Sequence, residues 1–303
     1  MDILSKIVLI AGPTASGKSS FAIKFANKIN GEIINADSMQ VYKELKILTA
    51  RPNKKNQKNI KHHLYGFQSV KKNFSTGAWL KLVTSKIKEI QKRNKVPIIV
   101  GGTGLYFRAL TEGLVKIPTI PIKVRNETRF LQKKIGQKNF YKKLIKIDPL
   151  VKNTINYNDV QRSIRAFEIK KFTKKSMIKW FSKTKIFFDI NIFLKIYLDF
   201  PRAKLIERIN QRVDTMFEKG AISEVVKFNK LNVKKQNSSN KVIGIGEIGK
   251  YLNGELNLKE TKERICIKTR QYAKRQTTWA RGQMKSWYKI DPNDLNSVIK
   301  KFK

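Results

Sequence analysis

The segment that most constrains the fold is a glycine-rich run at 12–19. Its residues are Gly12, Pro13, Thr14, Ala15, Ser16, Gly17, Lys18 and Ser19. This spacing, G-x-x-x-x-G-K-[ST], is that of a phosphate-binding loop, which needs a buried strand before it and a helix after it. The apolar run 7–11 and the helical spacing of apolar residues over 19–29 supply both. We predict that backbone N–H groups of the loop bind phosphate oxygens, that Lys18 reaches the outer phosphates and that Ser19 binds Mg²⁺.

The rest of the chain predicts an α/β fold around this loop. Short apolar runs at 7–11, 32–36, 96–100 and 192–198 alternate with helical patterns, which is typical of a parallel sheet. A Pro-containing linker opens the Lys-rich segment 119–189, where strand signals are scarce. We therefore predict a first core part at 1–118, a mostly helical insertion at 119–189, and a return to the core with C-terminal helices at 190–303.

Two polar positions follow predicted strands, as the glycine loop does. Asp37 comes after the run 32–36, and Thr103 lies in a glycine-rich turn after the run 96–100. Ligands of open parallel sheets bind beyond the C-terminal ends of the strands, so these positions should converge. Two roles fit the Asp37 carboxylate equally well on spacing alone: a chemical one, binding Mg²⁺ through water or accepting a proton, and a cap for the following turn.

Charge and cysteine usage narrow the function class. The formal net charge of +43 favours a polyanionic partner, most simply nucleic acid. An A+T-rich coding sequence would also enrich lysine, so clustered arginines carry more information than the total. The one cysteine, Cys266, excludes an internal disulfide and a Cys-rich zinc site. With no apolar run of about 18 residues, we expect a cytoplasmic protein without membrane contact.

The most informative basic segment is 269–281. On a helix, one face would carry Arg270, Lys274, Thr278 and Arg281, and a more apolar face would carry Ile265, Tyr272, Gln276 and Trp279. A basic stripe over a packed aromatic face suits a phosphate backbone, although a solvated surface helix has the same pattern. Arg162 and Arg165 form a smaller basic pair, preceded by Asp159, which we interpret as a helix cap. His62 and His63 are adjacent and lack the spacing of metal ligands, which indicates a structural role.

Together these motifs resemble the bacterial tRNA dimethylallyltransferases (MiaA type). The resemblance runs from the first strand to about Trp287, nearly the whole chain. Its carriers are the run 12–19, Asp37-Ser38 with Gln40-Val41-Tyr42, Thr49-Ala50-Arg51-Pro52, His62-His63-Leu64, Gly101-Gly102-Thr103-Gly104-Leu105-Tyr106, Asn158-Asp159 with Arg162 and Arg165-Ala166, Arg212-Val213-Asp214 with Met216 and Gly220, and the segment 269–281.

The resemblance implies transfer of a dimethylallyl group from its diphosphate to the exocyclic amine of an adenosine. That adenosine lies just 3′ of the anticodon in tRNAs that read codons beginning with U. The glycine loop would then bind the donor's diphosphate, with Mg²⁺ as cofactor and Ser19 as its protein ligand. Asp37 matches the family's general base, and Lys18 and Thr103 complete the implied catalytic set. Arg208 and Arg212 are further candidates for contact with the diphosphate.

The same resemblance implies an extended contact with the tRNA anticodon stem-loop, in which the helical insertion acts as a clamp and the target base leaves its stack. The implied RNA-binding residues are Asp37, Ser38, Met39, Gln40, Thr103, Arg125, Gln161, Arg162, Ser163, Ile164, Arg165, Lys274, Arg275, Gln276, Thr277, Thr278, Trp279, Ala280 and Arg281. We expect a monomer, since no segment resembles a coiled-coil seam.

The chain departs from the family's usual pattern at a few positions. Ile245 replaces an aromatic residue and Gly246 replaces a lysine, and Phe167 and Ala221 stand where leucine is usual. Three alternative functions stay open from the sequence. A P-loop kinase or ATPase would explain 12–19 but not the basic helix. A prenyltransferase of free adenine nucleotides would not need an RNA-binding insertion, and an RNA-binding protein with a relic loop would not need Lys18 and Asp37.

Overall fold

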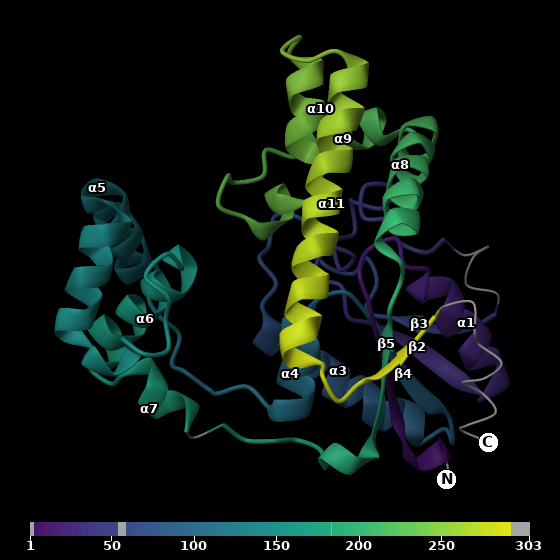
Figure 1. The fold of residues 1–303 in the computed structure, drawn as a ribbon, viewed down its shortest axis with the longest axis horizontal. Coiled ribbons are helices and arrows are strands. Elements are labelled where there is room, and N and C mark those ends of the chain that lie inside the picture. The colour runs from purple at the N-terminus through teal and green to yellow at the C-terminus, as the bar shows by residue number, and fades with distance from the viewer. Residues whose placement is uncertain (1–2, 54–58, 183, 292–303) are drawn as a thin grey trace. The chain divides into compact units, whose positions relative to one another are not determined.

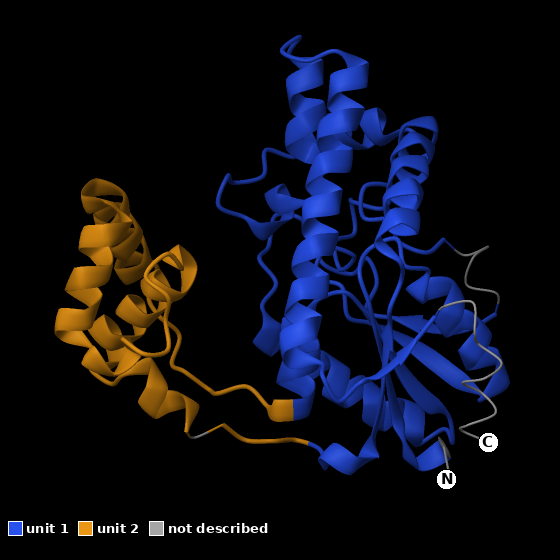
Figure 2. Ribbon diagram, viewed as in Figure 1, with its two compact units in different colours: residues 1–111, 188–303 blue, residues 112–187 orange. Residues whose placement is uncertain are grey.

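The computed structural model describes residues 3–53, 59–182 and 184–291. The chain forms two compact units (Figure 2): residues 1–111 with 188–303 make unit 1, and residues 112–187 make unit 2. The parallel α/β class predicted from the sequence is confirmed in unit 1 (Figure 1). Unit 2 is built from helices in its described part.

Unit 1 is organised around one parallel sheet with strand order β3-β2-β4-β1-β5-β6. The strands are β1 (Ile7–Ala11), β2 (Gly31–Asn35), β3 (His62–His63), β4 (Val96–Gly101), β5 (Phe193–Leu198) and β6 (Tyr288–Ile290). The central strands are buried along their whole length, because helices cover a parallel sheet on both faces. Sequence reasoning missed β3 and β6, which are too short to show an alternating pattern.

The helices of unit 1 fall into two groups. Those that follow or flank the sheet are α1 (Lys18–Lys28), α3 (Thr76–Gln91) and α4 (Gly104–Glu112), and those of the C-terminal part are α8 (Arg202–Glu218), α9 (Ala221–Asn229), α10 (Ile245–Leu252) and α11 (Leu258–Gln283). Helix α1 packs on β1, β2 and β4, while α8 to α11 share a second apolar core with residues 41–48. The longest of them, α11, packs along α8 (Figure 1) and begins with a capping box between Asn257 and Glu260.

Unit 2 contains α5 (Ile122–Ile147), α6 (Val160–Thr173) and α7 (Met177–Phe181), with a 3₁₀ turn at Pro149–Val151. Helices α5 and α6 enclose their own apolar core around Phe140, Leu144 and Phe167. Gly136, with φ of 74°, interrupts α5 and bends it. Asp159 caps α6 as predicted, since its Oδ1 accepts a hydrogen bond from the Arg162 backbone N–H at 2.9 Å.

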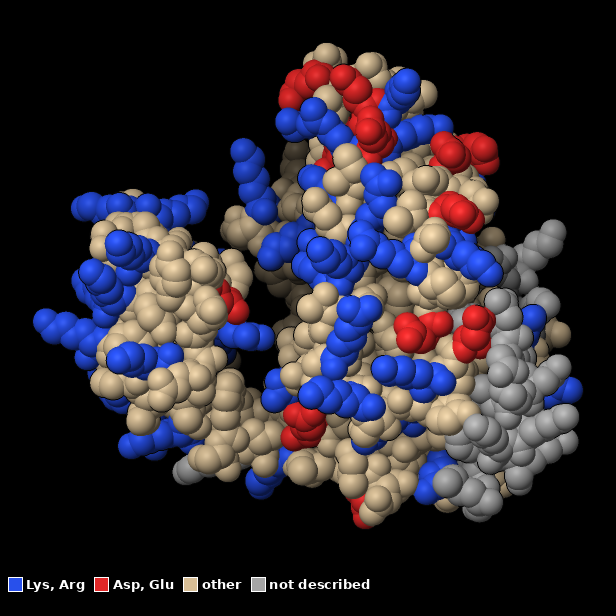
Figure 3. All heavy atoms as spheres, in the orientation of Figure 1, with Lys and Arg blue, Asp and Glu red and all other residues tan. Residues whose placement is uncertain are grey.

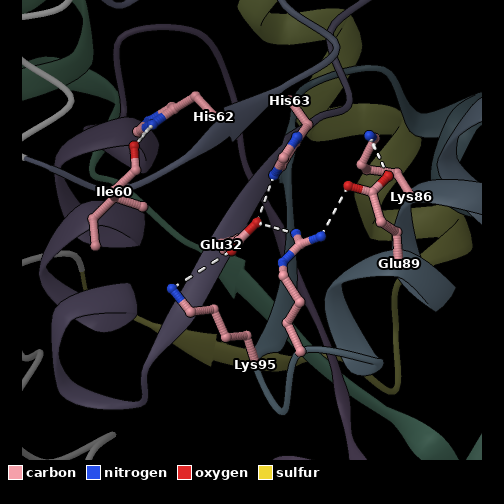
Figure 4. A network of polar contacts seen from close by, with 8 residues as sticks. Glu32, Ile60, His62, His63, Lys86, Glu89 and Lys95 are labelled. Atoms are coloured by element: carbon pink, nitrogen blue, oxygen red, sulfur yellow. Dashed lines mark hydrogen bonds and ion pairs between the residues drawn. The ribbon is translucent and has the colours of Figure 1, made fainter.

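A buried carboxylate fixes the edge strand β3 to the rest of the sheet (Figure 4). Glu32 on β2 is 1% exposed and binds His63 Nε2 and Arg93 Nη2, each at 2.7 Å, with Lys95 Nζ at 3.6 Å. Burial pushes the pKa of Glu32 up, but the hydrogen bonds from His63 and Arg93 outweigh it and hold the pKa below its usual value. His62 hydrogen-bonds the Ile60 carbonyl instead. Both histidines therefore have structural contacts.

Gly101, at the end of β4, allows a close approach of two strands. A Cβ on Gly101 would lie 2.1 Å from the Ala36 carbonyl oxygen, which is backbone and cannot move aside easily. We expect Gly101→Ala to lower the free energy of unfolding by about 1–3 kcal/mol, the usual cost of overpacking. Gly249→Ala is the matched control, because nothing lies within 4 Å of the added Cβ and the position is inside α10. The control should raise stability by about 0.5–1 kcal/mol. Chemical denaturation of both variants checks this, and an unchanged Gly101→Ala midpoint would contradict it.

Candidate functional site

The glycine loop joins β1 to α1 and leaves the start of α1 open. Gly17 has φ of 87° and Ala15 has φ of 63°, so both residues adopt a left-handed backbone conformation before the helix begins. No side chain caps the first turn, whose residues Lys18 and Ser19 line a cavity. The partial positive charge of a helix N-terminus therefore faces that cavity, which is the arrangement that binds phosphate. Lys18 Nζ donates to the Pro13 carbonyl at 2.6 Å and so lies over its own loop.

Two cations at this loop are held in surroundings that disfavour their charge. Burial lowers the pKa of Lys18 to about 8, an effect that the Asp37 carboxylate opposes and the Arg212 guanidinium increases. Burial also lowers the pKa of Arg212, again against the attraction of Asp37. Arg212 Nη1 donates to Thr14 Oγ1 at 2.9 Å, which ties α8 to the loop. A bound anion would stabilise both charges, so these residues form an electropositive anion site.

Asp37 lies two residues after the end of β2 and combines a structural contact with an available oxygen. Its backbone N–H donates to Asn35 Oδ1 at 2.8 Å, and its Oδ1 accepts from Met39 N at 2.8 Å and from Gln40 N at 3.4 Å. Both accepted bonds use Oδ1, which leaves Oδ2 unused by the described residues. The two roles that the sequence left open are therefore compatible, because one oxygen fixes the turn while the other stays available for a substrate.

The glycine-rich turn after β4 lets α11 dock beside the loop. A Cβ on Gly102 would lie 2.1 Å from Gln276 Nε2, and one on Gly104 would lie 2.3 Å from the Trp279 ring. Gln276 bridges the two segments, since its Nε2 donates to the Gly102 carbonyl at 2.9 Å and its Oε1 accepts from Thr14 N at 2.8 Å. Sequence reasoning did not find this role, because the partners lie 174 residues apart.

Thr103 in the same turn faces the segment after Asp37. Its backbone N–H donates to the Ala36 carbonyl at 3.2 Å, and its Oγ1 accepts from Ser38 N at 2.9 Å. The Thr103 hydroxyl also donates to Ser38 Oγ at 3.3 Å. The predicted convergence of the glycine loop, Asp37 and Thr103 is therefore observed at the C-terminal edge of the sheet.

Three adjoining cavities surround Asp37 and α11. The loop cavity, 220 Å³, is lined by Thr14, Ala15, Gly17, Lys18, Ser19, Ser20, Asp37, Gln40, Thr49, Ala50, Tyr65, Val100, Gly101, Arg212 and Gln276. The apolar cavity, 300 Å³, is lined by Thr14, Asp37, Met39, Leu48, Thr49, Arg212, Val213, Met216, Lys241, Val242, Ile243, Ile265, Thr269, Tyr272 and Arg275. The helix cavity, 270 Å³, is lined by Ala11, Gly12, Ser38, Gly102, Thr103, Gly104, Leu105, Phe107, Tyr197, Tyr272, Arg275, Gln276, Trp279, Ala280 and Met284.

Shared lining residues show that these cavities meet. Asp37 lines both the loop cavity and the apolar cavity, and Gln276 lines the loop cavity and the helix cavity. Tyr272 and Arg275 separate the helix cavity from the apolar cavity. Burial, and then the charge of Asp37, raise the pKa of Tyr272. Tyr272 was placed on the apolar face of its helix by periodicity, but sequence reasoning gave it no role in the site.

The remaining predicted residues of unit 1 differ in their exposure and in whether they line a cavity. On α11, Lys274, Thr278 and Arg281 are exposed, while Ala280 is buried. Arg208 lies over the Phe200 ring, 4.3 Å from its centroid, and does not line the three cavities, so its contact with diphosphate stays a prediction. Lys and Arg are spread over the displayed surfaces of both units (Figure 3), with acidic side chains in a few small groups.

Unit 2 carries the other predicted RNA-binding residues. Gln161 and Arg162 are exposed and Arg165 is half-buried on α6. The Ser163 and Ile164 side chains are buried in unit 2, so they face its core and not its surface. Burial follows from the helical period, which turns two residues of each helical turn inward. Arg125 lies on α5 near the start of that helix.

The two departures at 245 and 246 have different consequences. Ile245 is 8% exposed and belongs to the second apolar core. Gly246 is exposed, and nothing lies within 4 Å of a Cβ added there, so this position has room for a side chain. Among the described residues, every helix is too short or too polar to span a bilayer.

Comparisons with known proteins support the resemblance drawn from the motifs. The family model "IPP transferase" matches residues 40–283. A tRNA dimethylallyltransferase of Pelagibacter ubique is 62% identical over 303 residues, which cover 100% of this chain and 97% of the relative. One of Rickettsia felis is 43% identical over 281 residues, 92% of this chain and 91% of the relative.

Solved structures agree. A full-length tRNA isopentenylpyrophosphate transferase of Bacillus halodurans is 32% identical, with a TM-score of 0.70 over 97% of this chain and 94% of that one. A eukaryotic dimethylallyltransferase acting on tRNA is 31% identical, with a TM-score of 0.82 over 96% of this chain and 75% of that one. The sequence-based identification of the family is thereby confirmed.

Proposed function

Because the chain belongs to the IPP transferase family, we propose that it transfers the dimethylallyl group of dimethylallyl diphosphate to an adenosine of tRNA. The acceptor is the exocyclic amine of the adenosine just 3′ of the anticodon in tRNAs that read codons beginning with U, and diphosphate is released. The observation that carries the proposal is the position of Asp37, which lines both an anion site and an apolar cavity, while its neighbour Ser38 lines an aromatic cavity.

The loop cavity is the proposed site of the donor's diphosphate. Negative charge grows on the diphosphate as the allylic C–O bond breaks, so groups that stabilise that charge accelerate the step. The N-terminus of α1, Lys18 and Arg212 supply such groups around one cavity. The same residues would bind the phosphates of ATP, so the loop by itself does not select the donor.

A divalent cation fits this cavity through oxygen ligands. Ser19 lines the cavity beside Lys18, and Asp37 contributes a carboxylate to the same lining. Mg²⁺ prefers such hard oxygen ligands together with phosphate oxygens and retained water. When bound with the donor, Mg²⁺ would neutralise part of the charge on the leaving diphosphate. In the described residues, no group of three or more His, Cys, Asp or Glu side chains could hold a metal ion.

The helix cavity is the proposed site of the acceptor base. Trp279 and Tyr272 offer aromatic surfaces on which an extruded adenine can stack, and Thr103 and Ser38 offer polar groups at its edge. The apolar cavity, with Leu48, would hold the dimethylallyl group away from water that competes as a nucleophile. Both assignments follow from the chemistry of the lining residues.

Asp37 connects the two substrates chemically. The adenine amine is a weak nucleophile because its lone pair is delocalised into the ring. A carboxylate oxygen that accepts a hydrogen bond from the amine increases its nucleophilicity and takes the proton as the N–C bond forms. Among the described residues, none donates a hydrogen bond to Oδ2 of Asp37, whereas Oδ1 holds the turn at Met39. The new N–C bond, the broken C–O bond and the transferred proton balance the reaction.

The exposed basic face of α11 is proposed to bind the phosphate backbone of the tRNA. We expect Lys274→Ala to raise the Kd for tRNA about three- to tenfold. The slope of log Kd against log salt should fall by about the amount that corresponds to one lost phosphate contact. Lys28→Ala, an exposed lysine at the far end of α1 from the glycine loop, is the matched control and should change neither quantity. An unaltered slope for Lys274→Ala would favour the solvated-helix interpretation.

The experiment that tests the proposal identifies the product directly. Purified protein is incubated with Mg²⁺, dimethylallyl diphosphate and unmodified tRNA, and the tRNA is digested to nucleosides for mass spectrometry. We expect one adenosine per tRNA to gain a dimethylallyl group, next to the anticodon in fragment mapping. Unmodified adenosine throughout, with ATP hydrolysed in a parallel sample, would contradict the proposal and favour the P-loop kinase or ATPase alternative.

A further inference from the structure

Unit 2 contains a buried carboxylate that its apolar core does not explain. Glu168 on α6 is 2% exposed, and it lies within a unit whose described surface is rich in Lys and Arg. A buried carboxylate is costly unless cations or hydrogen bonds compensate for its lost hydration. The role of Glu168 therefore depends on which neighbouring side chains compensate its charge.

Three arginines surround this carboxylate. Arg165 Nη1 lies 3.4 Å from Glu168 Oε2, Arg125 Nε lies 3.9 Å from the same oxygen, and Arg129 Nε lies 3.8 Å from Oε1. Arg125 and Arg129 come from α5, one helical turn apart, and Arg165 comes from α6 one turn before Glu168. We call these four residues the Glu168 cluster.

The Glu168 cluster has more positive charge than its carboxylate can balance. Three guanidinium groups face one carboxylate, and only the contact from Arg165 is close enough for a hydrogen bond. Within the described chain, Glu168 Oε1 and Arg125 Nε are buried without a hydrogen-bond partner. Such incomplete satisfaction is unfavourable in a purely structural network. The excess of positive charge in the Glu168 cluster fits the binding of an anion from outside.

The arginines are accessible to such an anion. Their side chains are 42%, 50% and 38% exposed for Arg125, Arg129 and Arg165, while Glu168 is covered. The closest approach of Arg125 and of Arg129 to Glu168 is through Nε, at one edge of the guanidinium. Each guanidinium carries five N–H donors in a fixed plane, which suits bidentate binding of phosphate oxygens.

We propose that Glu168 is a positioning residue that holds Arg125, Arg129 and Arg165 together as one phosphate-binding cluster for the backbone of the tRNA. The inference rests on the proposed function and extends it in two ways. It assigns RNA contact to Arg129, which the family resemblance did not include, and it gives a role to a buried residue that touches no substrate. Without the carboxylate, the three guanidinium groups repel one another and spread apart.

The direction in which one substitution changes the affinity for tRNA distinguishes this inference from a simple charge effect. Glu168→Gln removes one negative charge, so a charge effect alone would tighten the binding of a polyanion. Positioning predicts the opposite, because the glutamine no longer attracts the three arginines. Glu127→Gln is the matched control: it makes the same change of charge in unit 2, but Glu127 is exposed and pairs with Lys171 at 2.7 Å outside the cluster.

The test measures equilibrium binding of unmodified tRNA without donor, together with steady-state transfer. For Glu168→Gln we expect the Kd and the KM for tRNA to rise about tenfold, with kcat at saturating tRNA within twofold of the wild type. The slope of log Kd against log salt should fall by the amount that corresponds to about two to three lost phosphate contacts. Glu127→Gln should bind tRNA as tightly as the wild type or more tightly, and Glu168→Asp should recover part of the affinity.

A second variant keeps the inference testable if Glu168→Gln does not fold. Arg129→Gln changes a half-exposed side chain, and we expect its Kd for tRNA to rise about threefold or more with the circular dichroism spectrum unchanged. Wild-type affinity in Arg129→Gln, or binding of Glu168→Gln that is unchanged or tighter, would overturn the inference while the wild type still transfers the prenyl group. A wild-type protein that binds no tRNA would overturn both the inference and the proposed function.

Discussion

Replacing Asp37 with asparagine is expected to lower kcat for prenyl transfer about a thousandfold while the Kd for tRNA changes less than threefold. The size follows from the loss of a general base, which contributes about 10²–10⁴-fold in enzymes. Asparagine is the most informative substitution because its side-chain oxygen can still accept a hydrogen bond from the backbone N–H of Met39, as Oδ1 of Asp37 does. The turn survives while the proton acceptor is lost, so the measurement separates the two roles of the residue.

The matched control is another acidic residue at the end of a strand. Asp199 follows β5 as Asp37 follows β2, but it lines none of the three cavities around the glycine loop. Asp199→Asn should keep kcat within a few-fold of the wild type. If Asp37→Asn retained a tenth or more of the wild-type kcat, Asp37 would be a cap only and the proposed mechanism would need another base.

Lys18→Ala has the second-largest expected effect. The lysine lies at the N-terminus of α1 and lines the loop cavity, where an incoming diphosphate would pair with the lysine charge in a partly buried position. We expect kcat/KM for dimethylallyl diphosphate to fall about a hundredfold or more, as when a preorganised donor is removed from a developing charge. Lys24→Ala, an exposed lysine on the same helix, is the control and should have no effect. An unchanged kcat/KM in Lys18→Ala would exclude the loop as the diphosphate site.

Because the pKa of Lys18 is lowered, the affinity for the donor should depend on pH. Below about pH 8 the free protein already carries the charged lysine, and above it the lysine must take up a proton to bind the diphosphate. Donor affinity should therefore decrease as pH rises through about 8, and this decrease should be absent in Lys18→Ala. Titration of dimethylallyl diphosphate at pH 7 and pH 9.5 with both proteins measures the difference. Parallel pH profiles for the two proteins would assign the dependence to another group.

Much of the fold was predictable because it depends on local pattern. The apolar runs at 7–11, 32–36, 96–100 and 192–198 became the four central strands with small shifts at their ends. The strands β3 and β6 were not predictable, since two or three residues carry no period. Long-range contacts decide their place: Glu32 binds His63 of β3, and the Asp199 backbone N–H donates to the carbonyl of Ile290 in β6.

The site was predictable in its parts but not in its assembly. The glycine loop and Asp37 stand in recognisable local contexts, and the rule that ligands bind at strand ends brings them together. The need for glycine at 102 and 104 depends on Gln276 and Trp279, whose positions only the tertiary structure gives. The same holds for the Glu168 cluster, since the ion pairs with Arg125 and Arg129 join two different helices, α6 and α5.

The central claim is that the chain prenylates tRNA, and one assay tests it most directly. Isotopically labelled dimethylallyl diphosphate and Mg²⁺ are given to the purified protein with unmodified tRNA, AMP and ATP as separate acceptors. We expect label on tRNA alone, and we expect Asp37→Asn to transfer it about a thousandfold more slowly. Label on AMP or ATP would contradict it in favour of a nucleotide prenyltransferase, and ATP hydrolysis without transfer of label would contradict the assignment of the glycine loop to a prenyl diphosphate.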